Sequence, residues 1–130
     1  MVREKIKWRS VCPICSALDV LGDKWTMLIV RELIIHESRT YSELLDLPEG
    51  ISTNILADRL TLLSSLMLIE RINPKSPARN NAFRLTKKGE ALRPVLEGLG
   101  KWAQVNLKKF HKEILTIPSK PNKKKTPSAR

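Results

Sequence analysis

The chain has 130 residues, and its 24 Lys and Arg against 13 Asp and Glu give a formal net charge of +11. A single domain of this size can bury roughly two thirds of its unfolded surface, so it needs no disulfide to fold. Eight basic residues and one acid lie from Lys108 onward, which leaves only +4 on residues 1–107. The charge favours a polyanionic partner, while the tail itself either contacts phosphates or is simply solvated.

No stretch of 18 or more residues is apolar enough to span a membrane, and no signal-peptide core follows the basic start. We therefore expect a cytoplasmic protein whose two cysteines stay reduced. Cys12 and Cys15 form a CxxC motif, which suits thiol exchange or half of a zinc site. His36 and His111 lack the spacing that would complete a zinc site, and the surrounding helical pattern does not fit a thioredoxin-like enzyme. We expect no enzyme activity, metal or cofactor.

The first part of the chain predicts an arm and two helices. Basic and apolar residues alternate through residues 1–10 of the predicted arm, residues 1–11, which fits a short edge strand or an arm laid on a partner. Cys12 is predicted to cap a helix that starts at Pro13 and ends at Gly22, because Pro is favoured at the first helical position. Asp23 should cap the next helix, KWTMLIVRELI, which is apolar on nearly all sides and therefore central. Trp25 is most simply a core residue of that helix.

The middle of the chain predicts two helices joined by a turn. Thr40 and Glu43 have the spacing of a capping box at the start of TYSELLDL, and a turn follows at 48–50. Ser52 is a good N-cap for a second helix, Ser52–Met67. Four residues recur on one face of that helix and should be buried, namely Leu56, Leu60, Leu63 and Met67. Helix, glycine turn and helix predict a helix-turn-helix.

Two short strands are predicted after the second helix, at 68–73 and 82–86, and a hairpin in this position is the wing of a winged helix. The fold class is therefore mainly α with a small β hairpin. The face of the second helix opposite its leucines is small and polar, with Thr53, Asn54, Ala57, Asp58 and Thr61. Such a face could read another molecule.

The last helix is predicted to start after Thr86, with Pro94 either bending it or marking where its regular part begins. Its apolar stripe consists of Leu92, Val95, Leu96, Leu99, Trp102, Ala103 and Phe110. The body of the protein cannot cover so long a stripe, so a second copy of the chain is the natural partner. From Thr116 onward the composition predicts a basic, disordered tail, which leaves 12–115 as the folded domain.

Several blocks between Cys12 and Trp102 resemble the HxlR-type winged-helix transcriptional regulators, a bacterial and archaeal family akin to the MarR group. They are Cys12-Pro13, LDVLGDKWTMLIVREL (18–33), YSELLDLPEGISTNILADRL (41–60), LIER (68–71) and RLTKKGEALRPVLEGLGKW (84–102). The resemblance implies a homodimer joined through its terminal helices, with recognition helices in successive major grooves and wings on the flanking DNA backbone. Leu62, Leu66 and Met67 stand where the family commonly has charged residues and a helix-ending Gly.

Within this framework Asn54 is the predicted base reader, because its amide can donate to and accept from adenine; alternatively it only solvates the helix start. Thr53 suits a phosphate at the helix N-terminus. Arg59 could reach a phosphate or pair with Asp58 or Glu43. The wing residues are either DNA contacts or solvated charges. The full predicted DNA-binding set is Thr40, Ser52, Thr53, Asn54, Ala57, Asp58, Arg59, Thr61, Lys75 and Arg79.

Two hypotheses about function remain open. The first is a sequence-specific transcription factor, most simply a repressor, that binds an inverted repeat as a homodimer and responds to a small molecule, electrophile or redox signal. The second is a non-specific architectural DNA-binding protein driven by its Lys-rich tail. The nearly uncharged reading face favours the first, since binding through charge alone would place Lys and Arg there. The predicted dimer interface is Leu96, Leu99, Trp102, Ala103 and Phe110.

Cys12 is the candidate sensor, because a helix N-terminus stabilises a thiolate and lowers the pKa of the thiol. The resemblance adds that some HxlR-type regulators use a cysteine at this position as a redox switch. Cys15, one turn further, could trap an oxidised Cys12. The alternatives are a small buried residue packed against the final helix, and a ligand lodged between the recognition domain and the dimer helices.

Overall fold

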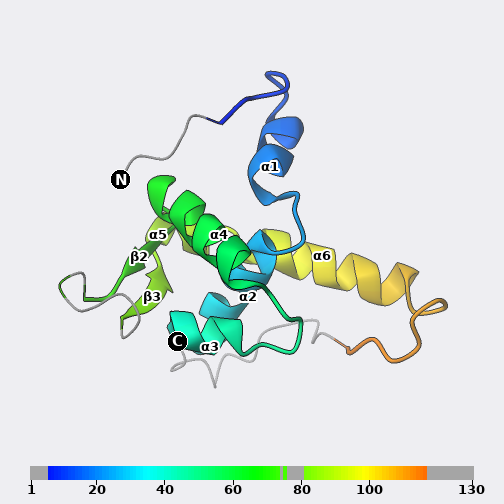
Figure 1. The fold of residues 1–130 in the computed structure, drawn as a ribbon. Helices are drawn as coiled ribbons and strands as arrows, with labels where there is room; N and C mark the ends of the chain where they lie inside the picture. The colour runs from blue at the N-terminus through cyan, green and yellow to red at the C-terminus, as the bar shows by residue number, and fades with distance from the viewer. Residues whose placement is uncertain (1–5, 74, 76–80, 117–130) are drawn as a thin grey trace.

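The computed structural model describes residues 6–73, 75 and 81–116, and it has the predicted fold class, mainly helical with a small antiparallel sheet (Figure 1). The elements are α1 (Pro13–Leu21), α2 (Thr26–His36), β1 (Arg39–Thr40), α3 (Tyr41–Leu45), α4 (Thr53–Ser65), β2 (Ile69–Arg71), β3 (Ala82–Leu85), α5 (Lys87–Glu90) and α6 (Arg93–Asn106). None of the described helices is long and apolar enough to cross a membrane. Arg79 and, apart from Thr116, the predicted tail lie outside the described residues.

Helix α2 lies at the centre of the molecule, as its nearly all-round apolar sequence predicted. Ile29, Val30 and Leu33 of this helix are buried, and they pack with buried residues of α3, α4 and the sheet. Trp25 packs against this core while remaining partly exposed, which confirms its prediction as a core residue. Asp23 accepts hydrogen bonds from the amides of Trp25 and Thr26, both at 2.9 Å, so it caps the chain just before the regular helix begins.

Helix α4 carries the predicted buried residues Leu56, Leu60 and Leu63, but it ends at Ser65. Met67 is 64% exposed and adopts φ +63°, so its predicted burial at the end of this helix was wrong. The amide of Met67 donates to the Ser64 carbonyl at 3.0 Å, and that of Leu68 donates to the Leu63 carbonyl at 2.9 Å. These two bonds form a Schellman motif, whose left-handed residue usually is Gly. Met67 therefore fills a backbone position that glycine suits better.

The sheet has three strands in the order β1-β3-β2, with both pairs antiparallel. The predicted hairpin is present with shorter strands, and Ile69 pairs with Leu85. Strand β1 was not predicted, because two residues are too few to show an alternating pattern. Arg39 of β1 pairs with Phe83 of β3. Because α3 starts directly after β1, this pairing holds the start of α3 beside the sheet.

The C-terminal part contains two helices where the sequence predicted one. Thr86 caps the short helix α5 by accepting the Gly89 amide at 3.1 Å. A Cβ atom on Gly89 would overlap the carbonyl oxygen of Leu68, so this close approach of α5 to the chain after α4 requires glycine. Pro94 lies in the first turn of α6, and it therefore marks where the regular helix begins.

Helix α6 ends at Asn106, so Phe110 lies beyond it and is 82% exposed. The prediction that Phe110 continues the helical stripe was therefore wrong. Residues 107–113 are all exposed in the protomer. A helix there would have no surface to pack against, and a short helix gains most of its stability from packing.

Candidate nucleic-acid interface

Local hydrogen bonds set the geometry of the helix-turn-helix. The Thr40 hydroxyl accepts the Glu43 amide at 3.1 Å, and the Glu43 carboxylate accepts the Thr40 amide at 2.9 Å, which confirms the capping box. Gly50 adopts φ +74° in the turn, a conformation that glycine reaches without strain. The Ser52 hydroxyl accepts the Ile55 amide at 3.2 Å, so Ser52 is the N-cap of α4 as predicted.

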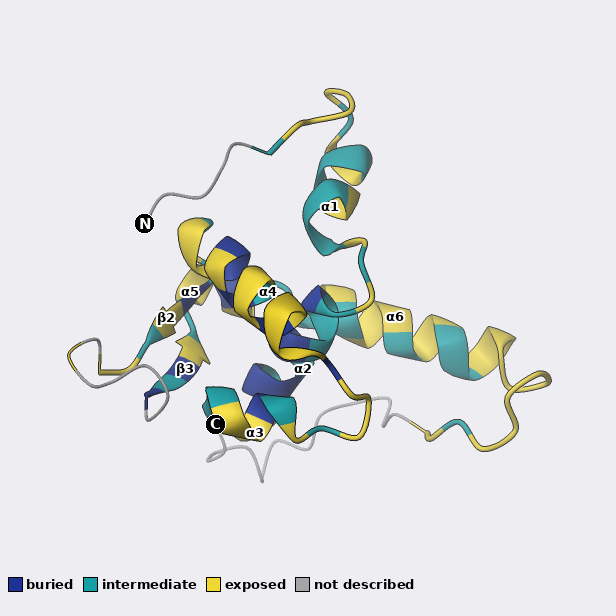
Figure 2. Cartoon of the chain, viewed as in Figure 1, coloured by how far each residue is buried: buried dark blue, intermediate teal, exposed yellow. Residues whose placement is uncertain are grey.

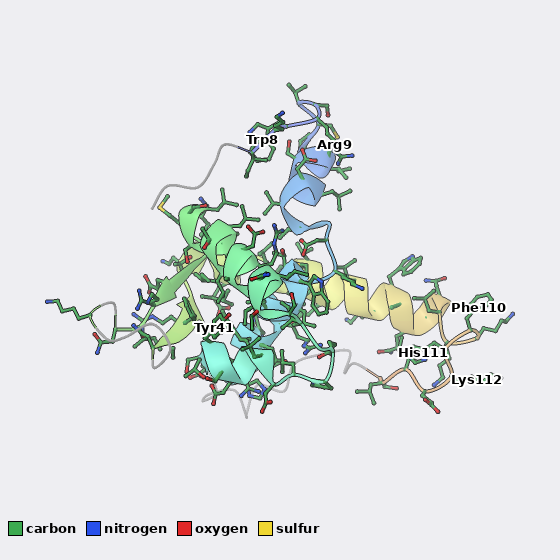
Figure 3. The ribbon with its side chains drawn as sticks, viewed as in Figure 1. Trp8, Arg9, Tyr41, Phe110, His111 and Lys112 are labelled. Atoms are coloured by element: carbon green, nitrogen blue, oxygen red, sulfur yellow. The ribbon has the colours of Figure 1, made fainter. Side chains whose placement is uncertain are left out.

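Helix α3 is also joined directly to the start of α4. The hydroxyl of Tyr41, labelled in Figure 3, donates to the carbonyl of Thr53 at 3.2 Å. Thr53 is the first residue of α4, so this bond holds the beginning of α4 against α3. Sequence reasoning missed the contact, since the two residues belong to different helices.

The exposed face of α4 is the candidate reading surface, and it runs along the outside of the molecule (Figure 2). Every residue predicted to lie on it is exposed, namely Thr53, Asn54, Ala57, Asp58 and Thr61, and the N-cap Ser52 is exposed as well. Ser64 and Ser65 are also exposed, and their positions along the helix extend the same face. The surface is thus built from small side chains, with hydroxyls along most of its length and Asn54 in the first turn.

Arg59 is held inside the protein. Its guanidinium donates to Asp58 at 2.5 Å and to Asp23 at 3.4 Å, and its side chain is only 20% exposed. Of the alternatives left open by the sequence, the structure shows the ion pair with Asp58; Asp23 is an additional partner, and Glu43 pairs elsewhere. Burial alone would raise the pKa of Asp23, but hydrogen bonds from Thr26 and Trp25 and the charge of Arg59 lower it below its ordinary value. Arg59 therefore links α4 to the residues before α2.

The wing lies beside the second half of α4. A hollow of about 350 Å³ separates them and is lined by Leu60, Thr61, Ser64, Ser65, Arg71 and Phe83. On the strands, Arg84 donates to Glu70 at 2.9 Å, and both side chains are about half exposed. Lys75 is exposed in the wing loop. The reading face and the described part of the wing therefore form one surface around this hollow.

The terminal helices leave apolar side chains uncovered. No residue of α1 or α6 is buried, and Leu18, Leu99 and Trp102 are each more than half exposed. Leu96 differs from the other predicted dimer residues because it packs against the core of its own protomer. Ala103 is half-buried.

Cys12 caps α1 in an extended conformation and is half-buried, as is Cys15. The amides of Cys15 and Ile14 lower the pKa of the Cys12 thiol, although the sulfur makes no full capping hydrogen bond. Next to it, Arg9 of the arm donates to Asp19 at 2.5 Å and to the Cys15 carbonyl at 3.3 Å. The described part of the arm, residues 6–11, forms no strand and folds back on α1 through Arg9 (Figure 3).

Comparisons with known proteins agree with this geometry. The model of the HxlR-like helix-turn-helix family matches residues 20–111. The HTH-type transcriptional regulator sll1512 of Synechocystis is 38% identical over 92 residues, which cover 70% of this chain and 67% of that protein. YodB, an HTH-type transcriptional regulator of Bacillus subtilis, is 33% identical over 96 residues, covering 72% of this chain and 84% of YodB.

Solved structures show the same fold. Reduced YodB matches with a TM-score of 0.59 at 32% identity, covering 72% of this chain and 92% of that chain. A transcriptional regulator of the MarR family from Porphyromonas gingivalis matches with a TM-score of 0.64 at 31% identity, covering 79% of this chain and 99% of that chain. Since the family model covers 20–111 of 130 residues, the protein belongs to the HxlR-like helix-turn-helix family of DNA-binding transcriptional regulators.

Proposed function

We propose that the protein represses transcription by binding an inverted-repeat operator in the cytoplasm as a homodimer. The observation that carries the proposal is the exposed face of α4, which offers hydroxyls and the Asn54 amide and whose arginine is held by two carboxylates. Hydrogen-bonding side chains on a helix read base edges in the major groove, whereas surfaces that bind through charge alone carry Lys and Arg. The reading face therefore suits sequence recognition.

The uncovered apolar side chains support the homodimer. Leu99 and Trp102 lie one turn apart on α6, and Leu18 of α1 is similarly exposed. In a two-fold dimer, the same apolar surface of a second copy of the chain would cover these side chains. A two-fold dimer presents two recognition helices to half-sites roughly 34 to 36 Å apart, about one turn of DNA.

The decisive experiment is to select the preferred DNA site in vitro and then to measure binding of Asn54→Ala. Loss of the Asn54 amide should weaken binding to the selected site by about 1 to 3 kcal/mol at one symmetric pair of bases, with non-specific binding unchanged. Asn106→Ala is the matched control, since this exposed asparagine lies near the end of α6. An equal loss on all DNA sequences would show that Asn54 does not read a base.

The alternative is a non-specific architectural function, which the eight basic residues from Lys108 onward favour. Measuring the DNA binding of a protein that lacks residues 116–130 distinguishes the two functions. A tail that only adds phosphate contacts should contribute affinity and salt dependence, so its loss should leave the preferred site the same. Complete loss of DNA binding would instead favour the architectural function.

We further propose that Cys12 makes this repression sensitive to oxidants or electrophiles. Its lowered thiol pKa favours the reactive thiolate, and YodB has been solved in quinone-bound and diamide-treated forms. Mild peroxide or a quinone should release operator DNA from the wild type, and dithiothreitol should reverse the effect of peroxide. Cys12→Ser should stay bound, while Cys15→Ser tests whether the second thiol is needed to form a disulfide.

If Cys12→Ser releases DNA as the wild type does, a ligand is the better candidate for the signal. An apolar hollow of about 260 Å³ lies between α1, the chain after α4 and the α5–α6 junction. Its lining includes Val20, Leu68 and Leu92, with Lys88 as its charged group. A small apolar molecule could bind there, between the reading helix and the terminal helices.

A further inference from the structure

We propose that Glu32 is a positioning residue for DNA recognition, because Arg31 and Arg39 link its buried carboxylate to the start of α3 and to the turn before α4. The inference rests on the proposed sequence-specific binding. Glu32 lies in α2, away from the reading face, and its side chain is only 6% exposed. A buried carboxylate is tolerated only when oppositely charged partners bind it. The partners of Glu32 therefore show which parts of the protein it holds in place.

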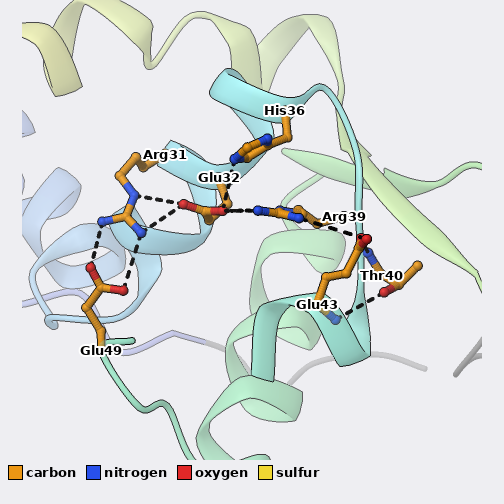
Figure 4. Close-up of polar contacts among 7 residues, drawn as sticks. All are labelled: Arg31, Glu32, His36, Arg39, Thr40, Glu43 and Glu49. Carbon is orange, nitrogen blue, oxygen red and sulfur yellow. Dashed lines mark hydrogen bonds and ion pairs between the residues drawn. The ribbon is translucent and has the colours of Figure 1, made fainter. Parts of the chain in front are cut away.

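Two arginines converge on Glu32 (Figure 4). Arg31 donates to Oε2 of Glu32 from Nε at 3.0 Å and from Nη2 at 2.8 Å. Arg39 of β1 donates to Oε1 from Nε at 3.2 Å, and its Nη2 lies 3.1 Å from the same oxygen. His36 approaches that oxygen with its Nε2 at 3.6 Å. Both carboxylate oxygens are thus engaged by groups on two different elements.

Each arginine also reaches a second carboxylate, so the charges alternate along a row of five side chains. Arg31 donates to the Glu49 carboxylate at 3.0 Å and 3.4 Å. At the other end, Nη1 of Arg39 lies 3.9 Å from Glu43, whose carboxylate also accepts the Thr40 amide. The pKa of Glu49 is lowered because Arg31 donates hydrogen bonds to its carboxylate, which favours the ionised form.

One end of this row lies at the start of α3, and the other end lies in the turn between α3 and α4. Glu43 belongs to the capping box that starts α3, and Glu49 lies in the turn, three residues before the N-cap Ser52. Glu32 therefore links the start of α3 and the start of α4 to the central helix. Apolar packing among α2, α3 and α4 is non-directional, whereas paired hydrogen bonds between arginine and carboxylate fix orientation. The row adds angular precision that the core alone does not supply.

The test compares Glu32→Gln and Glu49→Gln with wild type, using the DNA site selected for the full-length protein and a scrambled DNA of equal length. Binding is measured well below the unfolding midpoint of each variant. Glu32→Gln should reduce the ratio of specific to non-specific affinity by about threefold to thirtyfold, and Glu49→Gln by less. The loss should spread over all base pairs that α4 reads, unlike the single-position loss expected for Asn54→Ala.

Glu90→Gln is the matched control, because Glu90 also pairs with an arginine, Arg93, at 3.3 Å and lies at the α5–α6 junction. It makes the same change in charge, so it corrects for the general gain in DNA affinity on losing a negative charge. If Glu32→Gln does not fold, the exposed Glu49→Gln decides the question alone.

The results separate the two proposals. Folded variants that both keep the wild-type ratio would overturn the role of Glu32 while leaving sequence-specific binding intact. A wild-type protein without preference for any DNA sequence would overturn the proposed function, and the role of Glu32 with it.

Discussion

The segment from α2 through β3, which carries the proposed reading face and is called the reading half below, is built differently from the terminal helices α1 and α6. In the described part of the chain, every buried apolar residue lies between Ile29 and Phe83, within α2, α3, α4, the turn and the sheet. Helices α1 and α6 contain no buried residue, and α6 keeps Leu99 and Trp102 more than half exposed. The buried core thus lies within the reading half, with Leu96 of α6 packed against it, whereas the terminal helices leave most of their apolar surface for another molecule to cover.

The polar contacts follow the same division. The helix-turn-helix has side-chain caps at both helix starts and the row of charges through Glu32. Helix α6 begins at Arg93, and its N-cap Leu92 provides no side-chain hydrogen bond. A precise reading surface requires fixed orientation, and hydrogen bonds supply it; a dimer surface gains its stability mainly from buried apolar area. The following experiments test this difference, beginning with the largest expected effect.

Leu56→Ala should cause the largest loss of stability. The Leu56 side chain is fully buried, and truncating a buried leucine costs about 2 to 5 kcal/mol because it leaves a cavity. Urea unfolding measures the change in the free energy of unfolding. Ser64→Ala, at an exposed position of the same helix, should stay within about 0.5 kcal/mol. Equal effects of the two substitutions would contradict the closed core of the reading half.

Leu99→Glu or Trp102→Glu should weaken the dimer, by roughly a hundredfold, because each places a charge in the predicted interface. Both positions are exposed in the protomer, so its fold should survive the change. Light scattering over a range of concentrations measures the dissociation. Lys101→Glu, also exposed on α6, is the control for adding a carboxylate to this helix. Variants that remain dimers as tight as wild type would refute the interface.

Met67→Gly should stabilise the protein by about 1 kcal/mol, because glycine adopts φ +63° without the steric cost that methionine bears. Little packing is lost, since Met67 is 64% exposed. Thermal unfolding measures the gain. Ser64→Gly, in the regular part of α4, should have the opposite sign, as glycine lowers helix stability. A destabilising Met67→Gly would show that this side chain packs on something essential.

Asp23→Asn should have the smallest effect, and that effect should depend on pH. The lowered pKa of Asp23 means that its ionised form stabilises the folded state above the unfolded pKa, near 3.8. This stabilisation is lost as the pH falls through the lower folded pKa. The difference in unfolding free energy between wild type and Asp23→Asn should therefore shrink from pH 7 to pH 3. A constant difference would contradict the lowered pKa of Asp23.

The sequence by itself determined the local signals of this protein. The Thr40–Glu43 capping box, the Ser52 cap and the turn at Gly50 all form in the structure. Each of them depends on hydrogen bonds or backbone angles within a few residues, so neighbouring residue types suffice to predict it. Helical spacing also predicted the burial of Leu56, Leu60 and Leu63 in α4, although it did not include Leu62, which is buried as well.

The tertiary structure alone decided the contacts between distant residues. Strand β1 forms because β3 lies beside it, and Arg59 finds Asp23, 36 positions earlier in the chain. The convergence of Arg31 and Arg39 on Glu32 likewise requires the packed arrangement of α2 and β1. Met67, two residues after α4, adopts a conformation that its own side chain disfavours, because the chain must turn there into β2. Charge and periodicity describe one segment at a time, whereas these features depend on which segments meet.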